Sequence, residues 1–201
     1  TYGYILDSME AALWMGATRV VVHTGSANAP GGRAGALNLA VQALRTTLRM
    51  AEERNWMDQV AICPELMGKI NQLGDLDEVI TLCRLDDRLI PTIDFGHYNA
   101  RTHGGLKGYD EYMHVCGQIV NGLGVERLTK IHIHFSRIEF TAGGEKMHHT
   151  LADKQYGPDF EPLAQVIRDL AMEPVIISES KDTQAADAAE MKRIFQSGGS
   201  I

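Results

Sequence analysis

Cysteine is scarce in this chain of 201 residues, which holds Cys63, Cys83 and Cys116 and no others. No two of them form a C-x-x-C pair and their number is odd, which argues against a disulfide framework and against a cysteine-bound structural zinc. Cys63 stands inside a short apolar run, where a small buried hydrophobe is expected rather than a nucleophile. A reducing compartment, the cytoplasm, suits this cysteine usage best.

Long apolar runs and excess positive charge are lacking as well. No apolar run approaches the roughly 20 residues that a membrane span needs, and no charged segment followed by an apolar one opens the chain. The net charge of −7 argues mildly against broad binding to nucleic acid, because phosphate contacts need clustered Lys and Arg. We expect a soluble protein with no membrane partner, and its hydrophobic content of 44% is enough for one globular domain.

The glycine motifs that hold nucleotide phosphates are missing too. The stretch HTGSANAPGGRAG, residues 23–35, is rich in glycine but has neither G-x-G-x-x-G nor the Walker spacing. We expect a long loop beside the site there. The missing phosphate loop also weakens the structural alternative, a five-stranded doubly wound sheet.

Five short apolar runs, rich in β-branched residues, alternate with helical patterns along the chain. The runs are RVVVHTG, VAICPEL, LIPTIDFGH, KIHIHFS and PVIISES. Apolar residues recur at helical spacing over residues 6–15, 37–53, 75–83, 109–123, 160–171 and 183–195. This alternation predicts a parallel sheet in an α/β fold, and we assign a (β/α)8 TIM barrel. Such a barrel needs eight strands and about 250 residues. We therefore expect residues 1–201 to form one domain of the C-terminal five β/α units, with the N-terminal units missing.

Each of the five runs carries an acid or a histidine at or near its C-terminal end. In a parallel barrel these ends converge on one mouth, so the side chains can meet there around metal ions. The residues, in chain order, are His23, Glu65, Asp94, His97, His132, His134 and Glu179. We therefore expect the function to reside at the strand ends.

The two glutamates emerge from strands that should be buried on both faces. A buried carboxylate is costly unless a metal ion, a proton or a cation accompanies it. A salt bridge to a nearby lysine, such as Lys69 or Lys181, is the alternative explanation for Glu65 or Glu179 taken alone.

The histidines are placed to face a common pocket. In IDFGH, Gly96 lets the chain turn sharply, so that Asp94 and His97 can face one pocket. His132 and His134 alternate along their strand and therefore share one face, where two histidines are costly unless something binds them. A structural hydrogen-bonded pair is the alternative for Asp94 and His97.

The donors are oxygens and imidazoles without thiolate, a set that suits Zn²⁺, Mn²⁺ or Co²⁺. Several carboxylates close together can bridge two or more ions. Such a cluster would activate water and hold both oxygens of a displaced phosphodiester, or it would polarise a hydroxy-ketone for proton transfer. The residue types alone leave both reactions open. His148 and His149 follow in a later loop, where a solvated pair is the alternative to a ligand.

The order of these motifs resembles the xylose isomerase-like TIM barrels, and most closely the endonuclease IV family of abasic-site endonucleases. HTGS looks like that family's His-Pro-Gly-Ser segment, and PELMGKINQLG resembles its Glu-Asn-Thr-Ala-Gly-Gln-Gly segment. DFGH is similar to Asp-x-Cys-His, and IHIHFS to Ile-His-Leu-Asn-Asp-Ser. HHTL and IISES fit the family's later histidine and final glutamate. The match spans nearly the whole chain in the right order.

The resemblance implies a cluster of two or three divalent ions, Zn²⁺ first and Mn²⁺ as the alternative. Its ligands would be His23, Glu65, Asp94, His97, His132, His148 and Glu179. A central site would use Glu65, Asp94, His132 and Glu179. His23 would stand beside Glu65 on a second ion, and His97 with His148 would hold a third. Glu65 and Glu179 would be the catalytic residues. The implied activity is cleavage of DNA on the 5′ side of an abasic site by a metal-activated hydroxide, with the damaged nucleotide flipped out of the duplex.

This sequence departs from the family pattern at two places. The family's aspartate, two residues before the histidine matched by His148, falls on Lys146 here, and Glu145 is one place away. A metal-binding histidine of an earlier strand has no counterpart in the chain.

Sugar isomerases and epimerases of the same superfamily supply the alternative function. They use a Glu, Asp, His, Glu quartet on one ion, which the proposed central site matches equally well. His23, His97 and His148 favour the nuclease, because a one-ion epimerase does not need them as ligands. A third class is a metal-binding barrel that acts on a different phosphoester or on none. Arg33, Arg101 and Arg137 are candidates for phosphate contacts, with solvated surface arginines as the alternative.

Overall fold

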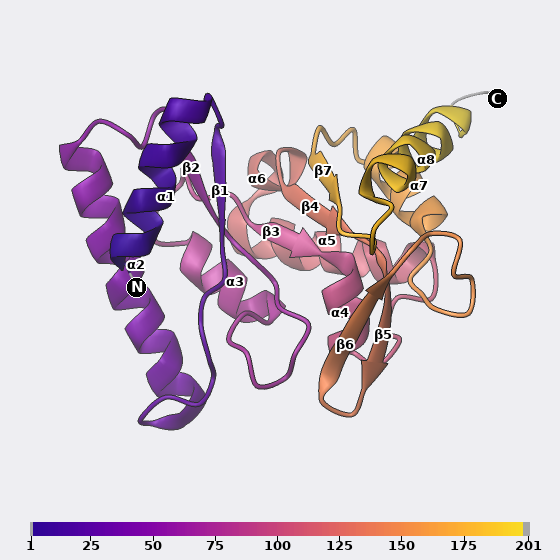
Figure 1. The fold of residues 1–201 in the computed structure, drawn as a ribbon, viewed down its shortest axis with the longest axis horizontal. Helices are drawn as coiled ribbons and strands as arrows, with labels where there is room; N and C mark the ends of the chain where they lie inside the picture. Colours follow the sequence, from indigo (N-terminus) through magenta and orange to yellow (C-terminus); the bar gives the residue numbers. More distant parts are fainter. Residues whose placement is uncertain (1, 199–201) are drawn as a thin grey trace. The chain divides into compact units, whose positions relative to one another are not determined.

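A computed structural model of the chain describes residues 2–198 (Figure 1). Two compact units divide the chain. The first unit comprises the residues up to Leu66 together with Asn71–Thr92, and the second comprises Met67–Ile70 together with the residues from Ile93 onward. The predicted α/β alternation is confirmed, because each of the five apolar runs contains a strand.

The first unit is built on a parallel pair of strands. β1 (Arg19–Val22) pairs with β2 (Ala61–Pro64), with Arg19 opposite Ala61 and Val22 opposite Pro64. α1 (Tyr2–Met15) packs on β1 and on α2 (Gly32–Glu53), and α3 (Leu76–Cys83) packs on β2 and α2. Leu44, Leu48 and Ala51 of the apolar stripe of α2 are buried, together with Ala36 and Thr47. The parallel pairing brings the C-terminal ends of β1 and β2 to the same edge.

A reciprocal cap starts helix α3. The Asp75 carboxylate accepts a hydrogen bond from the Glu78 backbone N–H at 2.9 Å, and the Glu78 carboxylate accepts one from the Asp75 backbone N–H at 2.9 Å. This capping box satisfies donors that the first helical turn leaves open. Arg33 of α2 adds an ion pair, with its Nε 2.6 Å from Glu78 Oε1.

The second unit contains a sheet whose strands lie in the order β3-β4-β7. They are β3 (Thr92–Asp94), β4 (His132–Phe135) and β7 (Val175–Ser178), and β4 pairs with β7 in parallel. The helices of this unit are α4 (Phe95–Arg101), α5 (Tyr109–Leu123), α6 (Val125–Thr129), α7 (Phe160–Asp169) and α8 (Gln184–Ser197). α8 packs on β7 and α7, and α4 packs on β4. Phe135 and Phe160 are buried with their ring centroids 5.0 Å apart.

An antiparallel hairpin follows β4 where the sequence predicts a loop. It consists of β5 (Arg137–Thr141) and β6 (Gly144–His149), and α4 packs against both strands. The pairing is irregular, because Met147 lies opposite Glu139 and Glu145 lies opposite Phe140. Lys146 is therefore an extra residue in β6, which is a β-bulge. This hairpin, visible below β4 and β7 in Figure 1, is outside the repeating β/α pattern.

All three cysteines are buried thiols, and burial raises the pKa of Cys63 to about 12, as expected for a core residue. Over residues 2–198, no helix combines the length and the apolar character that crossing a membrane takes.

Candidate metal centre

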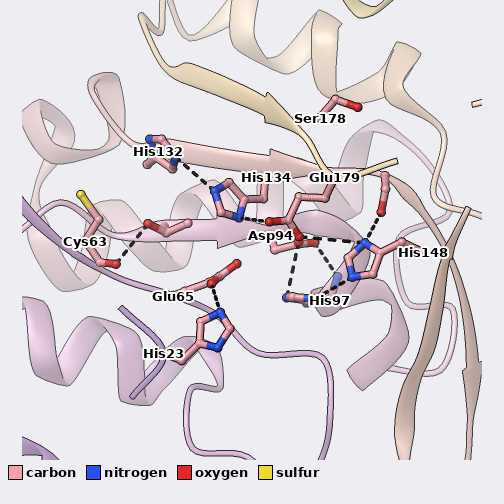
Figure 2. A network of polar contacts seen from close by, with 12 residues as sticks. His23, Cys63, Glu65, Asp94, His97, His132, His134, His148, Ser178 and Glu179 are labelled. Carbon is pink, nitrogen blue, oxygen red and sulfur yellow. Dashed lines mark hydrogen bonds and ion pairs between the residues drawn. The ribbon is translucent and has the colours of Figure 1, made fainter. Parts of the chain in front are cut away.

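His23 and Glu65 form a close pair in the first unit. His23 follows β1 and Glu65 follows β2, and the Glu65 N–H donates to the carbonyl of Val22 at 3.0 Å. His23 Nε2 lies 2.9 Å from Glu65 Oε2 (Figure 2). The Glu65 side chain is 2% exposed, whereas that of His23 is 66% exposed. A buried carboxylate thus meets an imidazole that solvent can reach.

Asp94 and His97 are joined by the start of a helix. Asp94 ends β3 and caps α4, since its Oδ1 accepts a hydrogen bond from the His97 N–H at 2.7 Å. Its Oδ2 lies 3.4 Å from His97 Nδ1, and both side chains are buried. The prediction of a sharp turn at Gly96 is wrong, because Gly96 belongs to helix α4. A side chain there would lie 2.9 Å from the Ser136 carbonyl, so glycine allows a close approach instead.

His134 and Glu179 come from the paired strands β4 and β7. His134 Nδ1 lies 2.9 Å from Glu179 Oε1 (Figure 2). Asp94, His134 and Glu179 each offer a ligand atom, and these atoms lie within 4.8 Å of one another. Of the two histidines in this strand the resemblance selects His132. In the structure the His132 Nε2 lies 3.2 Å from His134 Nε2, so His134 stands between His132 and Glu179.

His148, on β6, lies beside His97. The two Nε2 atoms are 3.3 Å apart, and His148 Nδ1 is 2.8 Å from Ser136 Oγ. His97, His148 and Glu179 form a second group whose ligand atoms lie within 4.8 Å of one another. Glu179 therefore belongs to both groups, which makes it the carboxylate best placed in this unit to bridge two ions.

Electrostatics around His148 favour positive charge. Burial lowers the pKa of His148, but the hydrogen bond to Glu145 and the charges of Asp94, Glu179 and Glu145 outweigh burial and raise it. The pKa of Glu145 is lowered, chiefly by His148 and against the effect of burial. The negative charges of these three carboxylates therefore favour a cation close to His148.

Sequence reasoning misses Glu145 as a site residue. Its Oε2 lies 3.5 Å from His97 Nε2, and its Oε1 lies 3.7 Å from His148 Nε2. The family spacing points to Lys146 instead, whose Nζ lies 2.6 Å from Glu139 Oε1. Glu145 could be identified only by knowing that a β-bulge interrupts the regular alternation of β6. That bulge depends on how β6 pairs with β5, which the local sequence does not reveal.

His149 is placed apart from His148. It stacks on Tyr156 with ring centroids 3.9 Å apart, and its Nε2 lies 3.4 Å from Glu139 Oε2. His149 thus packs within the hairpin and the loop after it, rather than in a solvated pair with His148.

The three arginines considered for phosphate contacts are engaged inside the chain. Arg33 pairs with the capping residue of α3, as described above. Arg101 donates to the carbonyls of Met67 and Lys69 at 3.1 and 2.9 Å. Arg137 is 3% exposed and donates to the carbonyl of Leu151 at 3.0 Å. All three stabilise local structure.

The donor set of the second unit fits a divalent metal ion. Asp94, Glu145 and Glu179 supply carboxylate oxygens, and His97, His134 and His148 supply imidazole nitrogens. This set of oxygen and nitrogen donors is the one that Zn²⁺ and Mn²⁺ accept in proteins. Three carboxylates gathered in such a cluster need a cation to offset their negative charge.

Comparisons with known proteins agree with this architecture. A sequence model of the family described as xylose isomerase-like TIM barrel matches residues 3–196. An uncharacterized protein of Methanocaldococcus jannaschii is 33% identical over 121 residues, which are 60% of this chain and 43% of that protein.

Crystal structures of several proteins are similar in fold, and two of them have different activities in their names. Endonuclease IV from Thermus thermophilus is 22% identical with a TM-score of 0.65, and the match covers 98% of this chain and 66% of that one. A D-tagatose 3-epimerase-like protein is 21% identical with a TM-score of 0.64, over 95% of this chain and 65% of that one. The chain thus spans less than half of the curated relative and about two thirds of each structure.

Proposed function

Because the chain belongs to the xylose isomerase-like TIM barrel family, we propose that it is a divalent-metal-dependent enzyme with its metal ligands at the strand ends. Within that family we propose an endonuclease IV-like phosphodiesterase that cleaves DNA on the 5′ side of abasic sites. One observation carries this choice. The second unit contains two histidine–carboxylate groups that share Glu179, which is more than a single ion requires.

Asp94, His134 and Glu179 are the proposed ligands of one ion in the second unit, and His97 and His148 are proposed for another. The resemblance assigns His132 as a ligand. We propose that His132 instead orients His134, since the two Nε2 atoms are 3.2 Å apart. A partner on the outer nitrogen of a metal-binding histidine fixes its ring and its tautomer.

We extend the proposal to His23 and Glu65, which lie 2.9 Å apart in the first unit. The buried Glu65 would supply a ligand oxygen, and His23 would hold an ion from the solvent side. Glu65 and Glu179 are the proposed catalytic residues, because each would touch the ions directly. Zn²⁺, in two or three copies, is the proposed cofactor, with Mn²⁺ as the alternative.

The residues of the second unit prepare the site before any substrate binds. Asp94 and Ser136 contact the Nδ1 atoms of His97 and His148, which leaves both Nε2 atoms directed to a common point. Bound divalent ions would supply the chemistry, lowering the pKa of water and stabilising negative charge on the phosphodiester. The chain holds these groups in place, so little reorganisation is needed during the reaction.

A sugar isomerase or epimerase of the same family is the second candidate. Asp94, His134 and Glu179 belong to the kind of quartet that holds one ion in such enzymes. The net charge of −7 also favours a small sugar over DNA. The D-tagatose 3-epimerase-like structure is as similar in fold as the endonuclease, so fold does not separate the two.

Nicking of a duplex with one synthetic abasic site tests the proposal. We expect the full chain, supplied with Zn²⁺ or Mn²⁺, to cut the strand on the 5′ side of that site, and EDTA to stop the reaction. An identical duplex with an intact base is the control and should stay uncut. Absence of nicking, together with turnover of a panel of ketoses, would establish the isomerase in its place.

A further inference from the structure

Glu145 and His148 lie three residues apart in β6, a spacing that puts two side chains on opposite faces of a regular strand. The bulge changes this. Lys146 is the extra residue between the pairs Glu139–Met147 and Phe140–Glu145. One inserted residue shifts the alternation by one, so Glu145 and His148 come to the same face. Both then reach His97 on α4.

The Glu145 carboxylate spans the two imidazoles. Its Oε2 is 3.5 Å from His97 Nε2, its Oε1 is 3.7 Å from His148 Nε2, and the two nitrogens are 3.3 Å apart. Two tetrahedral ligands at about 2.05 Å from zinc lie about 3.3 Å apart. The spacing of the nitrogens therefore equals that of two ligands on one ion.

The outer nitrogen of each imidazole has its own partner. His148 Nδ1 is within hydrogen-bond distance of Ser136 Oγ at 2.8 Å, and His97 Nδ1 makes an ion-pair contact with Asp94 Oδ2 at 3.4 Å. Histidines that bind metal commonly donate their other N–H to such a carboxylate or oxygen, which directs the remaining lone pair to the ion. The two Nε2 atoms are thus the nitrogens left to face an ion.

The backbone beside Glu145 is shaped to let it approach. A Cβ added at Gly68 would lie 2.6 Å from Glu145 Cβ and 2.9 Å from His97 Cδ2, so only glycine fits there. The carbonyl of Gly68 accepts a hydrogen bond from the Glu145 N–H at 3.1 Å, and Arg101 holds the carbonyls on either side of Gly68. The backbone of Glu145 is therefore fixed in a position that brings its side chain close to His97.

We infer that Glu145 is a ligand of the Zn²⁺-like ion proposed for His97 and His148, and that the β-bulge at Lys146 supplies this carboxylate. The inference rests on the proposed metal dependence, and it assigns a ligand that the sequence spacing excludes. Glu145 takes the place that regular alternation would give to an acid two residues before His148.

The test is a count of Zn²⁺ per chain by elemental analysis after dialysis, with affinity measured by competition with a chelator. We expect Glu145→Gln to lose one ion or to bind it at least tenfold more weakly. Glu139→Gln is the matched control on the opposite strand of the hairpin and should keep the wild-type count. Circular dichroism and thermal unfolding check that each variant is folded.

Deletion of Lys146 tests the bulge itself. Removing the extra residue leaves Glu-Met-His, in which regular alternation again puts the acid and the histidine on one face. We expect the deletion variant to keep the ion that Glu145→Gln loses. Loss of that ion on deletion, in a folded variant, would overturn the role of the bulge.

The outcomes separate this inference from the proposed function. A wild-type chain without any divalent ion would overturn both. A chain that binds ions and nicks abasic DNA, but whose ion count and affinity are unchanged by Glu145→Gln, would overturn the Glu145 site alone.

Discussion

The two units position their candidate ligands by different means. In the first unit, His23 and Glu65 simply follow neighbouring parallel strands, and the imidazole is 66% exposed. In the second, His97 and His134 are buried, and a helix cap, a strand pair and a bulged hairpin each deliver part of the group. Strand ends alone thus produce a histidine–carboxylate pair that is open to solvent. The buried cluster of the second unit also needs a helix cap and a hairpin, which position the nitrogens of its histidine rings.

The largest effect is expected at Glu179, the carboxylate common to both groups of the second unit. Glu179→Gln should lower nicking of abasic DNA at least about 1000-fold, because bound ions supply several kcal/mol of transition-state stabilisation. The Zn²⁺ count should fall as well. Glu65→Gln should also abolish nicking with the fold intact, and full activity of that variant would remove Glu65 from the site.

Substitution of one histidine in each unit tests whether burial sets the cost of losing a ligand. His97→Asn should weaken Zn²⁺ binding about 100-fold, since a buried ligand cannot be replaced by solvent. His23→Asn should weaken it only about tenfold, because water can take the place of an exposed imidazole. Chelator competition measures both affinities. Equal losses would show that exposure does not set the difference between the units.

The close approach at Gly68 predicts a stability effect confined to the second unit. Gly68→Ala should lower the free energy of unfolding by about 1–3 kcal/mol, because the new methyl group overlaps Glu145 and His97. Gly117→Ala is the control, since Gly117 lies within α5 and a Cβ there meets nothing within 4 Å. That variant should be more stable by about 0.5–1 kcal/mol. Urea denaturation measures both, and an unchanged Gly68→Ala protein would contradict the packing.

The smallest effect concerns a carboxylate of the first unit with a structural role. Burial raises the pKa of Glu78, but Arg33 and the N–H groups of Gly74 and Asp75 outweigh burial and hold this pKa below its usual range. Because the folded pKa is depressed, Glu78 stabilises the fold above its unfolded pKa and loses this effect as pH falls through the folded value. Glu78→Gln should cost about 1 kcal/mol at pH 7 and nothing at strongly acidic pH.

Urea denaturation across that pH range measures the difference. Asp77→Asn, in the same helical turn, is the control for loss of one negative charge. A Glu78→Gln penalty that does not shrink in acid would show that packing, not ionisation, is what Glu78 contributes.

The strand-end residues could be predicted from sequence because apolar runs locate the strands and the residues after them. His23 and Glu65 follow β1 and β2, and Asp94 lies at the end of β3, where the pattern puts them. The choice between His132 and His134 could not be made that way. Both lie on one face of β4, and only pairing with β7 brings Glu179 next to His134.

The hairpin cannot be predicted from the sequence, for a related reason. GGEKMHH has no strict alternation, and its strand pairing depends on β5 and on the bridge between Lys69 and Gly144. Such partners are distant in sequence, so their effect on which face Glu145 occupies is invisible in a local pattern. The close approach of Gly96 to the Ser136 carbonyl cannot be predicted from the sequence either, because Ser136 follows a different strand.

The ion content of the wild-type chain tests the central claim most directly. Elemental analysis of the purified protein should find two or three divalent ions per chain, because its histidines and carboxylates form more than one ligand group. A single ion per chain would contradict that claim and would favour the one-ion isomerase.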